Sequence, residues 1–173
     1  MSNDSSLKIS NFLDSPLESG VQILAAEYYI PVFWLAMFTT EDLKTFWDID
    51  NEVEVPYLAT TVSRAIKTFE HRVSNLKKMF TNIDDYIPEW TQLQKKMTMN
   101  YVLVDLDDVL EMDEDGREQL LPALKAIDEP DVDSMVAFAK LTCFSDIFDQ
   151  SSGTLNEVHN RPSVKEYLCG FER

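Results

Sequence analysis

Apolar residues recur at intervals of three and four between residues 61 and 80, the most regular pattern in the chain. Such spacing puts the apolar side chains on one stripe of an α-helix, which turns that stripe towards a core. Thr61 is suited to cap the start of this helix. The stripe comprises Val62, Ala65, Ile66, Phe69, Val73, Leu76 and Phe80, and the opposite face carries Arg64, Lys67, His71, Lys77 and Lys78.

Three other segments have the composition or alternation of β-strands. Residues 29–38 are aromatic and β-branched, which favours a buried strand, and residues 55–60 form an extended stretch with Pro56 near its start. From residue 100, apolar and acidic positions alternate. Val102, Val104 and Leu106 share one parity, and Asp105 and Asp107 share the other, which predicts a half-buried strand with an acidic face to about residue 107.

Capping residues and prolines predict the remaining helices. Thr39 or Thr40 can cap a helix that ends before an acidic connector at residues 48–54, Pro88 can open another, and Asp131 can cap a third. Residues 113–116 have the composition of a turn. Further helices are expected after a capping box at residues 15–18, over residues 117–127 despite Pro122, from residue 132 to about 148, and over residues 162–170.

The order of these elements predicts an α+β fold. We expect a single compact domain over residues 12–173, in which a mixed or antiparallel sheet packs against several helices, because no linker or composition break divides the chain. Residues 1–11 are polar and rich in serine, so we expect a flexible N-terminus there. The aromatic residues near the first expected strand, including Phe46 and Trp47, are expected in the core, whereas Trp90 is a candidate for a partly exposed interface anchor.

Composition narrows the cellular setting. The longest apolar run covers residues 28–38 and contains Pro31, so it is too short for a bilayer span. The N-terminus lacks the basic flank and apolar stretch of a secretory signal, and we therefore expect a cytoplasmic protein with no membrane contact. In that compartment Cys143 and Cys169 are expected to be reduced thiols that are partly buried.

The charge of the chain is negative and unevenly placed. The net charge is -16, and residues 101–150 hold fourteen carboxylates against three cations. Such a field repels nucleic-acid phosphates and anionic membranes and attracts cationic surfaces, which predicts a basic protein as partner. The expected partner-binding residues are Asp105, Asp107, Asp108, Glu111, Asp113, Glu114, Asp115, Glu118, Asp131 and Asp133, of which the last two belong to a second acidic stretch that also contains Asp128 and Glu129.

One short motif invites a catalytic interpretation. The sequence from Tyr101 to Leu110, an apolar strand followed by Asp105-Leu-Asp107, resembles motif one of the haloacid dehalogenase superfamily. That resemblance implies a parallel sheet, Asp105 as nucleophile, Asp107 as general acid/base and a magnesium ion beside both. We favour the simpler explanation that both aspartates are outward positions of a half-exposed strand. Only 66 residues follow Asp107, and no glycine-aspartate metal motif occurs among them.

Other ligand-binding patterns are incomplete. Glu111, Asp113, Asp115 and Gly116 match half of a calcium loop, but the twelfth position is Pro122, which cannot coordinate through its side chain. His71 is expected on the helix surface and His159 in a loop, without the paired spacing of a zinc site. With four glycines the chain has no phosphate-binding loop. We therefore expect no cofactor and no metal.

In size, acidity and lack of catalytic motifs the chain resembles bacterial immunity proteins and antitoxins. That resemblance is one of class and attaches no named family; it implies a non-catalytic protein that occludes a basic toxin or effector domain, encoded by an adjacent gene. The alternatives are a divergent magnesium-dependent phosphohydrolase that uses Asp105 and Asp107, and a regulatory or DNA-mimic protein whose carboxylates imitate phosphates.

Overall fold

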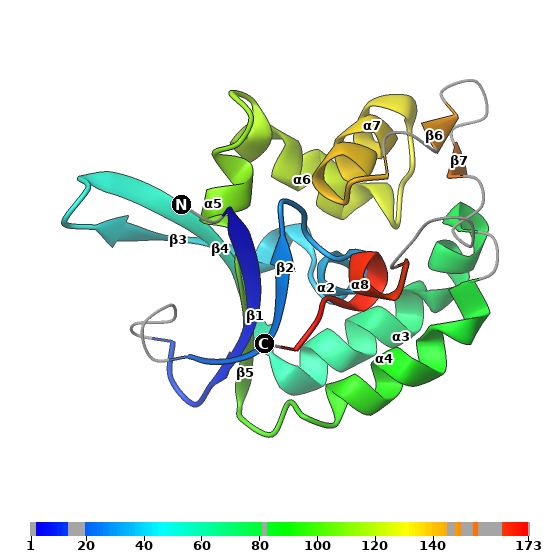
Figure 1. Ribbon diagram of the computed structural model, residues 1–173, viewed down its shortest axis with the longest axis horizontal. Helices are drawn as coiled ribbons and strands as arrows, with labels where there is room; N and C mark the ends of the chain where they lie inside the picture. Colours follow the sequence, from blue (N-terminus) through cyan, green and yellow to red (C-terminus); the bar gives the residue numbers. More distant parts are fainter. Residues whose placement is uncertain are drawn as a thin grey trace.

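The centre of the molecule is a five-stranded sheet in the order β2-β1-β5-β4-β3, in which every neighbouring pair is antiparallel (Figure 1). The computed structural model describes residues 3–13, 20–80, 83–144, 148–149, 154–155 and 164–172. The strands are β1 (Asp4–Ser10), β2 (Val21–Glu27), β3 (Leu43–Asp48), β4 (Val53–Thr61) and β5 (Tyr101–Asp105). A separate two-stranded ribbon pairs β6 (Phe148–Asp149) with β7 (Thr154–Leu155).

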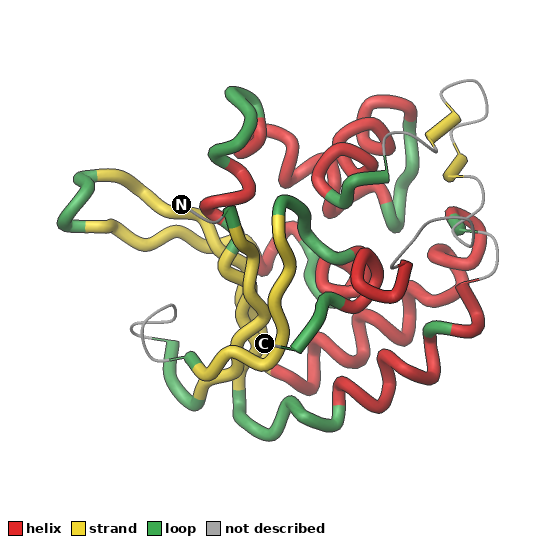
Figure 2. The backbone as a smooth tube through the Cα atoms, in the orientation of Figure 1, coloured by secondary structure: helices red, strands yellow, loops and turns green. Residues whose placement is uncertain are grey.

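Helices pack against one face of the sheet, which makes the fold α+β with an antiparallel sheet, as expected (Figures 1 and 2). Rings on α3 and α4 meet at Phe69 and Trp90, whose centroids are 6.1 Å apart. A smaller apolar cluster of Tyr57, Ala59 and Leu103 lies on the other face of the sheet. The helices are α2 (Val32–Ala36), α3 (Val62–Met79), α4 (Ile87–Gln94), α5 (Asp107–Leu110), α6 (Gly116–Ala126), α7 (Val132–Leu141) and α8 (Val164–Cys169), with 3-10 turns η1 (Thr40–Asp42) and η2 (Ile83–Asp85).

Residues 4–10 form β1, an interior strand, so the expectation of a flexible segment is wrong for these residues. Leu7 and Ile9 are buried in the main core, and β1 pairs with β2 on one side and with β5 on the other. The serines that gave the segment its polar character are buried too. Ser5, for example, donates a hydrogen bond from Oγ to the carbonyl oxygen of Tyr29, at 2.7 Å. A buried serine is tolerated when its hydroxyl is hydrogen-bonded, so these positions look polar in the sequence and the hydrophobic pattern does not predict the strand.

The expected strand over residues 29–38 is instead a buried helix, α2. All five of its residues are fully covered, so the segment is apolar on every side and shows no helical periodicity. Pro31 stands at the N-cap, where its missing N–H costs nothing. At the other end of α2, the Arg72 guanidinium from α3 donates to the carbonyl oxygens of Leu35, Ala36 and Phe38.

A β-hairpin replaces the helix expected after Thr40 and the connector expected at residues 48–54. Thr39 does cap, but only the 3-10 turn η1, through a reciprocal capping box with Asp42. The chain then enters β3, turns and returns as β4. The Asp48 carboxylate stabilises the turn by accepting hydrogen bonds from the backbone N–H groups of Asp50 and Asn51. We call residues 45–56 the arm, because this part of the hairpin extends past the β4–β5 pairing, which ends at Tyr57.

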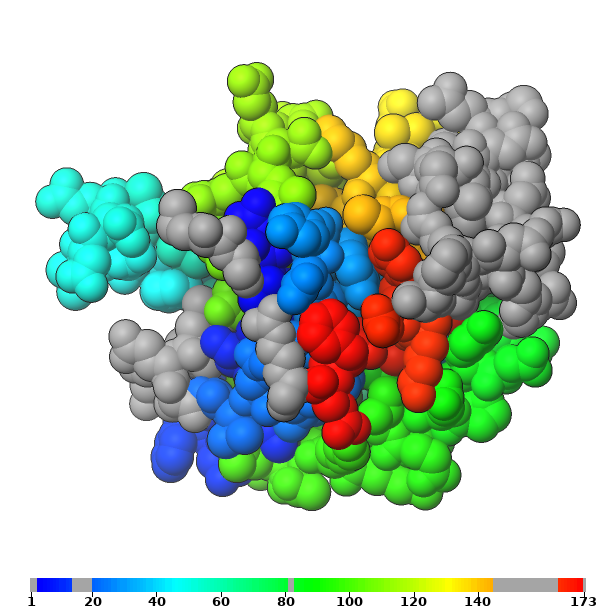
Figure 3. All heavy atoms as spheres, viewed as in Figure 1, coloured from blue at the N-terminus to red at the C-terminus, as the bar shows by residue number. Residues whose placement is uncertain are grey.

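The arm projects from the body of the molecule on the side away from the helices (Figures 1 and 3). Trp47 lies on it and is 58% exposed, so the expectation that Trp47 belongs to the core is wrong. Trp90 is fully buried between helices and cannot be the interface anchor that its position suggested. Local composition reveals neither whether a hairpin extends past the body, as at Trp47, nor whether a helical side chain is covered by a neighbouring helix, as at Trp90.

Several expectations are confirmed. Helix α3 covers residues 62–79 with Thr61 as its cap, and α4, α6 and α7 lie where the capping and proline signals place them, although α7 ends at Leu141. Strand β5 is covered on both faces and ends at Asp105, so it lacks the long wet face that alternation predicted. The predicted capping box at residues 15–18, Pro162 and His159 lie outside the described residues.

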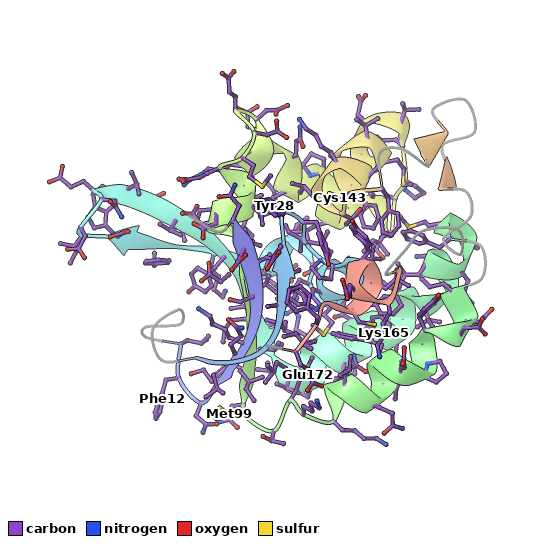
Figure 4. All side chains as sticks on the ribbon, in the orientation of Figure 1. Phe12, Tyr28, Met99, Cys143, Lys165 and Glu172 are labelled. Carbon is purple, nitrogen blue, oxygen red and sulfur yellow. The ribbon has the colours of Figure 1, made fainter. Side chains whose placement is uncertain are left out.

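Both cysteines are thiols, one half-buried and one buried. Burial raises the pKa of the Cys169 thiol to about 12, so it is protonated at neutral pH. Cys143 follows α7 with a positive φ and lies beside Tyr28 at the end of β2; its Sγ is 3.8 Å from the Tyr28 carbonyl oxygen (Figure 4). Chain segments far apart in sequence therefore meet at this point, since Ile30 N–H also donates to the Leu141 carbonyl oxygen.

Candidate partner-binding surface

The candidate surface begins where β5 ends and the chain turns into α5. Asp105 is the last residue of the strand, and its carboxylate pairs with Lys8 of β1 at 3.1 Å. Asp107 and Asp108 form the first turn of α5, on a different element from Asp105. The two aspartates of the expected catalytic pair therefore pair with different cations, since Asp107 contacts Arg117.

Arg117 of α6 joins three parts of the surface. One guanidinium nitrogen contacts the carboxylates of Asp107 and Glu111, at 2.9 and 3.1 Å, and the other donates to the backbone oxygen of Glu54 at 2.8 Å. Glu54 belongs to the arm. A single side chain thus ties the base of the arm to α5 and α6, and the acids of α5 lie next to those of the arm.

Lys140 organises the acids of the turn between α5 and α6. It reaches from the end of α7 to the carboxylates of Asp113 and Asp115, at 3.2 and 3.1 Å. The hydrogen bond from Lys140, and then that from Gln119, lowers the pKa of Asp115. Gly116 begins α6 at this point because any Cβ there would overlap the carbonyl oxygen of Leu110. The acids whose spacing resembles half of a calcium loop therefore pair with Lys140 at the start of α6.

Other acids of the predicted site lack such partners. Asp108, Glu114 and Glu118 are exposed and make no ion pair with a described residue. The Asp108 carboxylate is nevertheless partly shielded from water, and this desolvation, followed by the charges of Asp105 and Glu111, raises its pKa. Burial also raises the pKa of Asp107, although the adjacent Arg117 acts in the opposite direction. Negative charge at α5 is therefore only partly compensated within the chain.

Asp131 and Asp133 lie apart from this group, at the opposite end of α7 from Lys140. Asp133 and Lys140 are seven positions apart in the sequence, which corresponds to about 10 Å along a helix axis. Asp131 caps α7, and the hydrogen bond from the backbone N–H of Ser134 lowers the pKa of Asp131. A shallow groove of about 390 Å³ lies here, lined by Pro122, Lys125, Glu129, Asp131, Val132, Asp133 and Ser134.

The charge balance of the predicted residues favours a cationic ligand. Five of the ten carboxylates pair with Lys8, Arg117 or Lys140, and the other five make no ion pair with a described residue, so the group with its three cations keeps a net charge of -7. Exposed pairs of this kind stabilise a fold by less than about 1 kcal/mol each. The pairs fix the positions of some carboxylates more than they hold the fold together.

The arm adds a feature that sequence analysis missed. Three of its apolar side chains are exposed, Trp47 at 58%, Ile49 at 80% and Val53 at 39%. They are interspersed with Asp48, Asp50, Glu52 and Glu54. Apolar and acidic residues alternate on both sides of Asp50 and Asn51, two residue types that favour turns. That alternation could have revealed a hairpin with a mixed surface.

The fold differs from the one that the resemblance to haloacid dehalogenases implies. The sheet is antiparallel throughout, whereas the resemblance implies a parallel one. Within the described ranges, no group of three or more His, Cys, Asp or Glu side chains is arranged to hold a metal ion. His71 lies exposed on α3, as expected.

The chain was also compared with known proteins. No family model, no curated protein and no solved structure matches it. No helix in the part of the chain that the structure describes is both long and apolar enough to cross a bilayer. Function must therefore be argued from the acidic surface and the arm beside it.

Proposed function

We propose that this protein is a non-catalytic binding protein that neutralises a basic protein by occluding it, as immunity proteins and antitoxins do. The observation that carries the proposal is the continuity of acids, only partly compensated by cations of the chain, across α5, the turn after it and the arm, which Arg117 joins. The partner is a basic toxin or effector domain encoded by an adjacent gene.

Electrostatics supports this assignment. Asp107 and Asp108 have raised pKa values because burial and neighbouring carboxylates disfavour their charged forms. A cation docked beside them would relieve that repulsion, so charge complementarity would contribute to binding. Association would be steered by the acidic field and would slow as salt screens it.

The first test is retention of a partner from the native cells. The purified chain should retain one basic protein, and the association rate with that protein should fall steeply between low and physiological salt. Retention of no basic protein, or an association rate indifferent to salt, would contradict the proposal.

A matched pair of charge reversals tests the location. Glu114→Lys with Glu118→Lys changes the net charge as much as Glu70→Lys with Asp85→Lys does, and all four side chains are exposed. The first pair lies at the start of α6, and the second lies on α3 and in η2, outside the predicted partner-binding residues. We expect the first pair to slow association about tenfold and the second to have a much smaller effect. Equal effects would show that only total charge matters.

A further inference from the structure

The tip of the arm combines exposed apolar groups with carboxylates at fixed register. In the hairpin, Trp47 lies directly opposite Glu54, and Asp48 lies directly opposite Val53. Directly opposed side chains in an antiparallel pair have Cβ atoms about 4.5–5.5 Å apart. Each exposed apolar side chain in these two pairs therefore has a carboxylate as its cross-strand neighbour, on both faces of the hairpin.

This arrangement suits an arginine side chain. A guanidinium can stack on the face of an indole and at the same time donate to a carboxylate, which Lys does less well. Trp47 supplies the exposed indole and Glu54 the carboxylate, which makes no ion pair with a described residue. Arg117 contacts only the backbone oxygen of Glu54, which leaves the Glu54 side chain available.

The charge of the arm indicates which kind of partner can bind to it. Residues 47–54 contain four carboxylates and no cation, so two copies of the arm, or the arm and an anionic bilayer, would repel each other. The arm also lies at an edge of the sheet. At the opposite edge, β2 is bridged by Phe171, which exchanges two backbone hydrogen bonds with Ala25. At the edge formed by β3, no described strand pairs with the outer side of β3.

We propose that the arm is the anchor of partner binding: Trp47 and Ile49 enter an apolar cleft of the basic partner, and an arginine at its rim stacks on Trp47 and pairs with Glu54. This inference rests on the proposed function, because it names the surface through which the basic protein is held. The acids of α5 and α6 then govern encounter, and the arm governs dissociation.

The experiment starts in the native cells, with a photoreactive phenylalanine analogue at Ile49 or, as control, at Phe12. Phe12 is 67% exposed and lies well away from the arm (Figure 4). The protein cross-linked from position 49 is identified, purified and titrated against wild type, Trp47→Ala and Phe12→Ala. We expect a basic protein to cross-link from position 49 and not from position 12. Trp47→Ala should weaken its binding by about 30-fold or more, as loss of an interface hot spot does, and Phe12→Ala should not.

Tryptophan emission provides an independent measurement. The chain has three tryptophans, and Trp47 is exposed while Trp34 and Trp90 are buried. Docking of the arm should shift the emission to shorter wavelength, and Trp47→Phe should abolish that shift. Because Trp47 is 58% exposed in the unbound chain, Trp47→Ala should lower the urea unfolding midpoint only slightly, so a loss of binding of about 30-fold cannot be attributed to unfolding.

The possible failures are distinguishable. If a basic protein is retained by wild type and binds Trp47→Ala equally well, the inference about the arm is overturned and the proposed function stands. If wild type retains no basic protein, both are overturned. A dimer of this chain in sedimentation that Trp47→Ala dissociates would also overturn the inference, because the arm would then hold a second copy.

Discussion

Arg72 should be the most costly single polar side chain to remove, because it links three helical segments from a buried position. It leaves α3 with only 4% of its side chain exposed. Its guanidinium caps the end of α2 by donating to backbone oxygens there, including that of Phe38. It also forms a bidentate pair with Asp128, just after α6, with contacts of 2.6–3.2 Å. We consider the substitution Arg72→Met, which keeps the apolar stem and removes the charge.

The magnitude follows from which groups lose a partner. Loss of one member of a fully buried ion pair costs about 3–5 kcal/mol. Asp128 is 48% exposed, so water can solvate its carboxylate and reduce that penalty. The Phe38 carbonyl loses a charged donor, and such hydrogen bonds contribute about 1.5–3 kcal/mol. The contacts to Leu35 and Ala36, both at 3.4 Å, are too long to add much. We expect Arg72→Met to lower the free energy of unfolding by about 2–3 kcal/mol.

Urea titration followed by tryptophan fluorescence measures this loss, and thermal unfolding should show a midpoint lower by about 4–12 °C. Arg64→Met is the matched control, because Arg64 lies on the same helix but is 46% exposed and pairs at 3.0 Å with exposed Glu41. Its longer contact, at 3.5 Å, is with buried Asp42, whose carboxylate keeps the hydrogen bonds from Thr39, so the substitution should cost under about 1 kcal/mol. Arg72→Lys should recover less than half of the loss, since an ammonium cannot serve the carbonyls and Asp128 together. If Arg72→Met and Arg64→Met prove equally mild, the reasoning about the buried guanidinium is refuted.

Three further substitutions test other parts of the structure. Gly170→Ala should cost about 2 kcal/mol or more in urea unfolding, because Gly170 has a φ of +77° and its Cβ would lie 2.5 Å from Cζ2 of Trp34; an unchanged midpoint would contradict this packing. Leu7→Ala should cost about 2–5 kcal/mol while Phe12→Ala costs little, and equal effects would mean that β1 is not an interior strand. Asp108→Asn should raise stability slightly at pH 7. Its carboxyl pKa is raised from 3.8 by burial, so wild-type stability falls as pH rises through that window, and the gain should vanish in unfolding measurements near pH 3.

Helix α3 is the element that sequence analysis predicted most fully, because one of its faces is exposed to solvent. Helix α3 exposes Lys67 and His71 opposite its apolar stripe, so the helical spacing of its apolar residues can be recognised in the sequence. Helix α2 is buried all round and β1 carries buried serines, so neither has a polar face that would reveal its type. Their structures are decided by tertiary contacts, such as that of Ser5 with Tyr29.

The sequence predicted the negative charge of the candidate surface, but it did not predict how the charged residues are arranged in space. Acids of residues 105–118 do lie together, because Arg117 contacts Asp107 and Glu111 of the same stretch, and Lys140 reaches Asp113 and Asp115 from α7. The separation of Asp133 from them depends on the length and direction of α7. The exposure of Trp47 depends on how far the arm extends beyond β5, which is a property of strand register.

The position of β1 has a consequence for synthesis of the chain. Lys8 of β1 and Asp105 of β5 are 97 residues apart, so the second partner of this strand leaves the ribosome long after the first. At 5–20 residues per second that delay is about 5–20 s. Meanwhile the nascent β1–β2 hairpin offers an open edge to other nascent chains. The serines of β1 lower its tendency to pair with other chains. The polar composition that hides β1 from sequence analysis therefore also limits aggregation of the nascent hairpin before β5 is synthesised.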